Sequence, residues 1–223
     1  MKNLFYLACF AFLFSCTATK KSTSKIKGPV KVKIETDSGT IVVQLYDKTP
    51  LHRDNFEKLV KEGFYDSLLF HRVINHFMIQ GGDPNSKNAP EGILLGEGGL
   101  PYTVPAEFDS TLFHKKGVLA AAREGDASNP TKASSSTQFY IVQGKTFTDE
   151  ELNKVEERIK FKIPEEHRQV YRTIGGTPHL DMNYTVFGEV ISGMEVIDKI
   201  AATATDKNNR PLKNIKMKMT IIK

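Results

Sequence analysis

The chain has 223 residues, of which 39% are hydrophobic and 26% are charged, and its net charge is +5. This composition is that of an ordinary globular protein and excludes collagen-like or low-complexity chains. The lysines are scattered and form no stripe interleaved with aromatic residues, so nucleic-acid binding is not expected. The length allows one sizeable domain with a tail.

Residues 1–15 are expected to be a cleaved secretory signal peptide. Lys2 precedes an apolar run over residues 4–14, which is too short to span a bilayer. The adjoining Leu13-Phe14-Ser15-Cys16 resembles a bacterial lipobox, so we expect Cys16 to be lipidated, with export without a lipid as the alternative. Residues 16–29, rich in Thr, Ser and Lys, are expected to form a flexible tether. The protein would then be lipid-anchored in the cell envelope and face the periplasm.

Cys9 and Cys16 are the two cysteines, so the mature domain would contain no thiol. This excludes a disulfide framework, a cysteine nucleophile and a thiolate metal site. The six histidines lack ligand spacings such as HExxH, and no metal is expected. The serines at 134–136 lie outside any G-x-S-x-G elbow and are interpreted as a turn.

The domain begins with a predicted strand pair and a helix. Residues 30–36 alternate apolar and charged side chains, a pattern typical of a half-buried strand. A turn at 37–39 leads to a returning strand over 40–46. Pro50 then opens a helix that Gly63 ends.

Residues 70–83, FHRVINHFMIQGGD, predict a β-hairpin in which two apolar runs flank the polar link Asn75-His76. Strict alternation places Arg72 between Phe70 and Ile74 on one face, and places Met78 with Gln80 on one face of the returning strand. A charge among apolar neighbours is either solvated at an edge or functional.

A Gly- and Pro-rich loop over 85–103 precedes two further predicted strands. The first, 117–122, carries small side chains, which either leave space for a ligand or another backbone or simply pack tightly. The second covers 138–142. Toward the end of the chain we expect a strand over 185–190, a helix over 193–200 and a last strand over 213–222.

Residues 145–177 interrupt this pattern with helical signals. Thr148 with Glu151 forms a capping box, and Pro164 opens a second helix. At about thirty residues this insertion is too small to hold its own core. Two interpretations stay open: a lid or client surface beside a site, or an inert embellishment.

FHRVINHFMIQGGD resembles the signature hairpin of the cyclophilin family of peptidyl-prolyl isomerases. Likewise QFYIV, at 138–142, resembles the family's SQFFI element, and LDMNYTVFG, at 180–188, resembles LDGxxxVFG. The resemblance covers residues 30–223 apart from the insertion. It implies one cyclophilin-like domain that is mainly β, a closed eight-stranded antiparallel barrel with two capping helices, here extended by the helical insertion.

The resemblance also implies the roles of individual residues. Arg72 falls on the catalytic arginine, Gln80 on the glutamine that orients it, and Gln138 on a peptide-contacting glutamine. The remaining substrate-binding positions fall on Phe77, Met78, Ala122, Tyr140, Leu180 and Tyr184. The Tyr140 hydroxyl, absent from the family's usual phenylalanine, needs water or a partner. We expect His71 to point to the opposite strand face with a structural role, and no role is evident for His76 or His114.

Three positions depart from the family pattern: Arg123 replaces a common asparagine, His179 a common tryptophan, and Tyr184 a common histidine. These changes are expected to affect the affinity for the substrate more than the catalytic step. The replacement at His179 also argues against strong binding of cyclosporin. None of the three replacements removes Arg72 or an apolar residue of the expected pocket.

An X-Pro bond rotates slowly because rotation breaks amide resonance, a barrier of about 18–20 kcal/mol. An apolar pocket for the ring and a fixed cationic donor for the nitrogen would lower that barrier without any cofactor. We therefore expect a monomeric peptidyl-prolyl cis-trans isomerase whose partners are proline-containing polypeptides among exported or envelope proteins. A weakly catalytic chaperone using the same groove is the alternative. A barrel that binds a small apolar molecule is disfavoured, because abundant Phe, Ile, Val and Leu would fill its interior.

Overall fold

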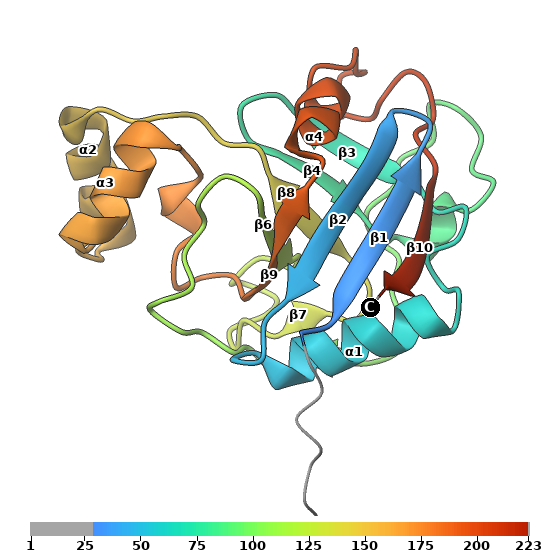
Figure 1. Ribbon diagram of the computed structural model, residues 1–223, viewed down its shortest axis with the longest axis horizontal. Coiled ribbons are helices and arrows are strands. Elements are labelled where there is room, and N and C mark those ends of the chain that lie inside the picture. The colour runs from blue at the N-terminus through green and yellow to red at the C-terminus, as the bar shows by residue number, and fades with distance from the viewer. Residues whose placement is uncertain (1–28, 223) are drawn as a thin grey trace, which may run out of the picture.

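The computed structural model describes residues 29–222, which form a strongly curled β-sheet, two helices at its ends and a projecting helix pair (Figure 1). The predicted signal peptide, Cys16 and the tether up to residue 28 lie outside the described residues. Within residues 29–222, no helix combines the length and the hydropathy needed to cross a bilayer.

The main sheet has eight strands in the order β10-β1-β2-β9-β6-β8-β4-β3, and every neighbouring pair is antiparallel. Its strands are β1 (Lys31–Thr36), β2 (Gly39–Leu45), β3 (Phe70–Ile74), β4 (Met78–Gly81), β6 (Val118–Ala121), β8 (Phe139–Val142), β9 (Val186–Ser192) and β10 (Met217–Ile222). A separate small sheet pairs β5 (Thr103–Val104) with β7 (Ser134–Ser135). Two of the serines expected in a turn therefore lie in a short strand, because β5 supplies a backbone partner.

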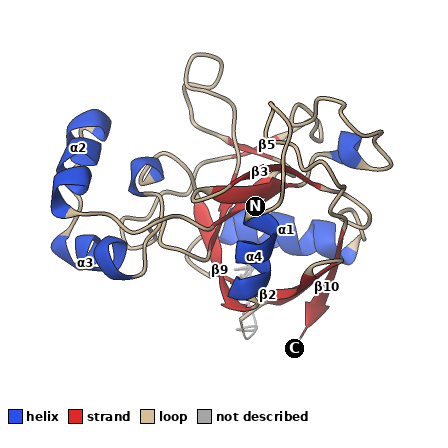
Figure 2. Ribbon diagram, turned by 90° about the horizontal axis from the view of Figure 1, so that it is seen from above, coloured by secondary structure: helices blue, strands red, loops and turns tan. Residues whose placement is uncertain are grey.

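The edge strands β3 and β10 approach each other without a continuous ladder. Leu69 and Lys216 form an isolated bridge, and the Phe70 amide donates to the Ile215 carbonyl at 3.0 Å. Figure 2 shows the resulting curl. The antiparallel eight-stranded barrel is confirmed, but "closed" overstates it, since the last seam is only bridged.

Helices α1 (Pro50–Lys61) and α4 (Met194–Ala201) cap the barrel as expected (Figure 2). α1 begins at proline, whose fixed φ suits the first helical position. The Glu107 carboxylate accepts hydrogen bonds from the amides of Leu51 and His52, both at 3.0 Å, and so caps the free amides of this helix. The helix buries Phe56, Leu59 and Val60 against the sheet.

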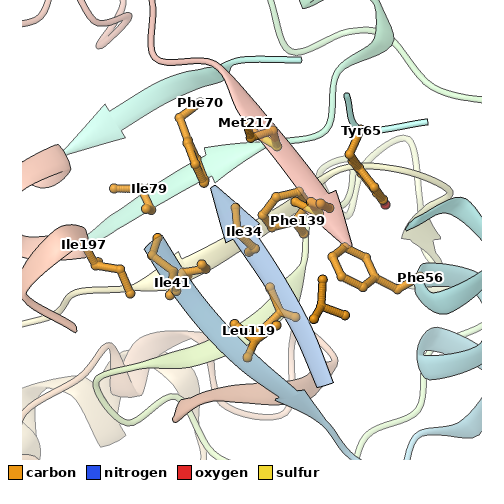
Figure 3. Close-up of a cluster of buried hydrophobic side chains, with 14 of the residues drawn as sticks. Ile34, Ile41, Phe56, Tyr65, Phe70, Ile79, Leu119, Phe139, Ile197 and Met217 are labelled. Carbon is orange, nitrogen blue, oxygen red and sulfur yellow. The ribbon is translucent and has the colours of Figure 1, made fainter. Parts of the chain in front are cut away.

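Large apolar side chains fill the barrel (Figure 3). Ile34, Ile41 and Leu119 are fully buried, and Phe139 packs edge-on against Phe56 at 5.5 Å between ring centroids. A filled interior argues against the barrel as a container for a small molecule.

The predicted insertion consists of α2 (Asp149–Ile159) and α3 (Glu165–Thr173), which project from one side of the barrel (Figure 1). The Thr148–Glu151 capping box is present. The insertion buries a small apolar cluster of Leu152, Val155, Ile163 and Tyr171. Phe113, from the loop before β6, packs against that cluster, so the barrel supplies what the short helices lack. Two single turns, η1 (Pro84–Ser86) and η2 (Pro178–Leu180), complete the helical structure of the described chain, and α2 packs against η2.

Candidate active site

A β-bulge in the β3–β4 hairpin sets the direction of Arg72. Phe70 pairs with Gly81, while Arg72 already pairs with Gln80, so β3 carries one extra residue, His71. Phe70 therefore packs inside the barrel, whereas Arg72 lies on the outer face. The prediction that Phe70 and Arg72 share a face is wrong, because a bulge breaks strict alternation. Met78 and Gln80 do share the face of Arg72.

Outside the barrel wall lies a cavity of about 350 Å³, within the size range of ligand sites. It brings together Arg72, Phe77, Met78, Gln80, Ala122, Tyr140, Leu180 and Tyr184, all named from the sequence. Its apolar part is a second cluster of buried side chains, separate from the barrel core. Two larger hollows, at 35–37 with 216–218 and between the insertion helices, are lined mainly by charged or polar surface side chains.

Three side chains form a hydrogen-bonded row along one edge of this cavity. Arg72 Nη1 donates to Gln80 Oε1 at 3.0 Å, and Gln80 Nε2 donates to Gln138 Oε1 at 3.0 Å. Gln138 Nε2 in turn donates to the carbonyls of Gly96 and Gly98, each at 2.8 Å. Gln138, predicted to contact peptide, thus lies behind Gln80 and ties the arginine to the loop that borders the cavity.

The Arg72 guanidinium is half-buried and makes no ion pair with any carboxylate among residues 29–222. Burial lowers the pKa of this guanidinium, yet arginine stays protonated in proteins. Its single hydrogen bond is to a neutral amide, so the charge is left unneutralised at the mouth of an apolar cavity.

Arg123 forms the wall behind Tyr184. Its guanidinium lies 4.5 Å from the centroid of the Tyr184 ring, a cation–π geometry. Nε donates to the Asn183 carbonyl at 2.7 Å, and Nη1 lies 2.7 Å from Asp126. Sequence reasoning noted Arg123 as a departure but missed this role. It also missed the cavity-lining Leu95, Gly96 and Glu97, for which the only signal was the glycine-rich loop.

The buried Tyr140 hydroxyl has a hydrogen-bond partner. It lies 2.9 Å from His114 Nε2, while His114 Nδ1 lies 3.0 Å from Asp181 Oδ1. Burial raises the pKa of Tyr140 well above its usual value, so the hydroxyl stays protonated. No role was expected for His114, and the structure corrects this, since the ring is fully buried and holds a pocket residue.

Two more histidines lie at or next to the cavity: His71 lines it, and His179 packs on the lining residue Phe77. His179, at the position of the family's common tryptophan, stacks on Phe77 with 5.5 Å between ring centroids, so an aromatic ring covers that pocket residue. His71 lines the same cavity as Arg72, so its expected place on the opposite face is wrong, again because of the bulge. Neither His71 ring nitrogen makes a hydrogen bond of good geometry within the described chain. Burial lowers the pKa of both histidines to about 4, which keeps them neutral at pH 7.

Within residues 29–222 no group of three or more His, Cys, Asp or Glu residues is placed to hold a metal ion. The arrangement therefore consists of an apolar pocket for a ring, one uncompensated cation at its rim and amide groups that orient it. Such a site can bind and polarise a substrate without forming a bond to it. Fold and site together define a β-barrel enzyme of the rotamase type.

Comparison with known proteins agrees. The sequence model of the family described as "Cyclophilin type peptidyl-prolyl cis-trans isomerase/CLD" matches residues 31–221. A Staphylococcus haemolyticus protein assigned as a peptidyl-prolyl cis-trans isomerase is 33% identical over 187 residues, which cover 83% of this chain and 87% of that protein.

A crystal structure of a Cryptosporidium parvum cyclophilin-type isomerase has a TM-score of 0.62 at 23% identity, covering 87% of this chain and 98% of that one. The same parasite protein solved in the presence of the dipeptide Ala-Pro has a TM-score of 0.61 at 23% identity, with 86% and 99% covered. These likenesses show the fold. The chain belongs to the cyclophilin family and is a peptidyl-prolyl cis-trans isomerase.

Proposed function

We propose that this isomerase holds the proline ring of a polypeptide between Phe77, Met78, Tyr140 and Leu180, with Arg72 as its catalytic residue. The observation that carries the proposal is the unneutralised, half-buried guanidinium beside an apolar cavity. Ala-Pro in the crystal of the Cryptosporidium relative supports a proline-containing ligand.

The chemistry follows from the rotating bond. At the twisted transition state the amide nitrogen loses resonance and becomes a better hydrogen-bond acceptor than in either planar isomer. A guanidinium fixed by Gln80 favours that state over both ground states, and each ~1.4 kcal/mol of such selective stabilisation gives about a tenfold rate gain. Gln80, Ala122 and Tyr184 would contact the flanking peptide, and Gln80, held by Gln138, would orient the arginine.

The test is an isomerisation assay on a short X-Pro peptide with wild type, Arg72→Ala and the surface control Arg53→Ala. Arg53 lies on α1 and pairs with Asp47 and Asp54. We expect activity in wild type and in the control and a large loss in Arg72→Ala. Binding or aggregation suppression without isomerisation would instead support the chaperone alternative.

We also propose that the clients are exported or envelope proteins and that Cys16 carries a lipid anchor. This rests on the charged start, the apolar run at 4–14 and the lipobox-like residues 13–16. Metabolic labelling with a radioactive fatty acid should mark the wild-type protein but not Cys16→Ser. Equal labelling of the two, or none in wild type, would contradict the anchor.

A further inference from the structure

A chain of hydrogen bonds connects the insertion to the pocket. The Tyr171 hydroxyl, on α3, donates to Asp181 Oδ2 at 2.7 Å. Asp181 Oδ1 lies 3.0 Å from His114 Nδ1, and His114 Nε2 lies 2.9 Å from the Tyr140 hydroxyl. Tyr171 and His114 are fully buried, Asp181 is 3% exposed and Tyr140 is 4% exposed. None of the four side chains in this hydrogen-bonded network is therefore exposed to solvent.

One His114 tautomer, with the proton on Nδ1, satisfies every bond of this network. Tyr171 and His114 Nδ1–H donate to the two oxygens of Asp181, and Tyr140 donates to His114 Nε2. Burial raises the pKa of both tyrosine hydroxyls, so both remain donors. A buried network that is satisfied in one way holds its members in one geometry.

Close backbone contacts fix the insertion, and with it the Tyr171 end of the hydrogen-bonded network, to the barrel. The segment leaving α3 hydrogen-bonds the segment before β6: the Thr177 amide donates to the His114 carbonyl at 2.8 Å, and the Lys116 amide donates to the Gly175 carbonyl at 2.9 Å. A Cβ on Gly176 would lie 2.2 Å from the His114 carbonyl oxygen. A shift of α3 would therefore be transmitted to His114.

The Tyr140 end of this hydrogen-bonded network forms part of the pocket wall. Tyr140 contributes its ring, and Asp181 directly follows Leu180. Tyr184 stands edge-on to Tyr140 with 6.0 Å between ring centroids. Because the Tyr140 hydroxyl is held from behind, the ring has one fixed depth in the cavity.

We propose that the insertion sets the affinity of the pocket for proline, because the Tyr171 hydroxyl acts through Asp181 and His114 to position the Tyr140 ring. Tyr171, Asp181 and His114 are positioning residues in this account and do not touch the substrate. The inference rests on the proposed function and deepens it. It gives the insertion a role as a structural support for the pocket, distinct from a lid or client surface and from an inert embellishment.

The first test is Tyr171→Phe, which deletes one hydroxyl and keeps the ring in its cluster. We expect the KM or Kd for a short X-Pro peptide to rise about three- to tenfold, the scale of one lost hydrogen bond, with kcat within about twofold. Tyr65→Phe is the matched control, because its buried hydroxyl donates to the Thr137 carbonyl at 3.2 Å within the barrel cluster. This control should lose comparable thermal stability and keep the wild-type KM.

A double-mutant cycle then tests the route. Tyr140→Phe removes the hydroxyl at the pocket end and retains the ring, so in that background Tyr171→Phe should change KM no further. Fully additive effects, or an unchanged KM in Tyr171→Phe, would overturn the inference. Those outcomes differ from failure of the proposed function, which would appear as an inactive wild type or an active Arg72→Ala.

Discussion

Replacing Arg72 with methionine should stabilise the fold while removing most of the activity. Full burial of an unpaired ion costs several kcal/mol, so a half-buried guanidinium costs roughly 2 kcal/mol. The hydrogen bond to Gln80 has an ionised donor, but at this partly exposed site water competes for both groups, so the bond returns only about 1 kcal/mol. Methionine keeps an apolar stem of similar length without the charge. The free energy of unfolding should therefore rise by about 1 kcal/mol, measured by urea denaturation.

The catalytic activity of Arg72→Met should fall, although its stability rises. Loss of one fixed donor to a transition state typically costs about 10²–10³-fold in rate, and we expect a drop of that order in kcat/KM. Arg168→Met is the control for stability, because Arg168 pairs with Glu156 at 3.0 Å and Asp149 at 2.8 Å, and its loss should destabilise the fold. Arg72→Met that is no more stable than wild type, or active within about tenfold, would refute the reasoning.

Three further outcomes are expected. Gln138→Ala should lower kcat/KM about tenfold because it releases Gln80. Gln143→Ala is the control, because this side chain is comparably buried but bonds to the His76 amide and Asp198 rather than to Gln80; equal losses in the two variants would contradict a special role for the Gln80–Gln138 hydrogen bond. Gly82→Ala should cost about 3 kcal/mol by thermal unfolding, since φ is +93° and the new Cβ would lie 2.2 Å from a carbonyl oxygen; a wild-type Tm would contradict it. The pKa values of His71 and His179, about 4 against 6.5 unfolded, mean that the unfolded chain protonates first as pH falls. The free energy of unfolding should therefore fall from about pH 6.5 to 4, and a flat profile would refute neutral burial.

The sequence was sufficient for the parts of the molecule that depend on local periodicity. The hairpin around Arg72 and the capped helices of the insertion follow from patterns a few residues long, whereas the apolar pocket residues were implied by the resemblance to the cyclophilin family. The bulge at His71 does not, because an extra residue in one strand is defined only by the partner strand. For that reason the faces of Phe70 and His71 were misassigned while the residues themselves were identified.

Contacts between distant segments were beyond sequence reasoning. His114 meets Tyr140 and Asp181 across 26 and 67 positions of the sequence, and Tyr171 meets Asp181 across 10. None of them has a neighbour in sequence that signals a shared network. Arg123 is similar, since its stacking on Tyr184 depends on the path of the loop after β6. A single sequence offers periodicity and motifs, and neither encodes which buried polar groups satisfy one another.

A second group of residues shows why residue types alone would misplace the site. His52 Nε2 lies 2.9 Å from the Ser134 hydroxyl, and His52 Nδ1 lies 2.7 Å from Glu107, which is the composition of a serine-hydrolase triad. Ser134 is only 1% exposed, and both Glu107 oxygens already accept amide bonds at the start of α1. No substrate carbonyl can reach that serine without unpairing the helix cap and the β5–β7 sheet, so these groups tie α1 to the pocket-side loops. Arg72 differs in the two respects that matter for chemistry, an open approach and a charge not neutralised by the protein, and it is there that a peptide can be acted upon.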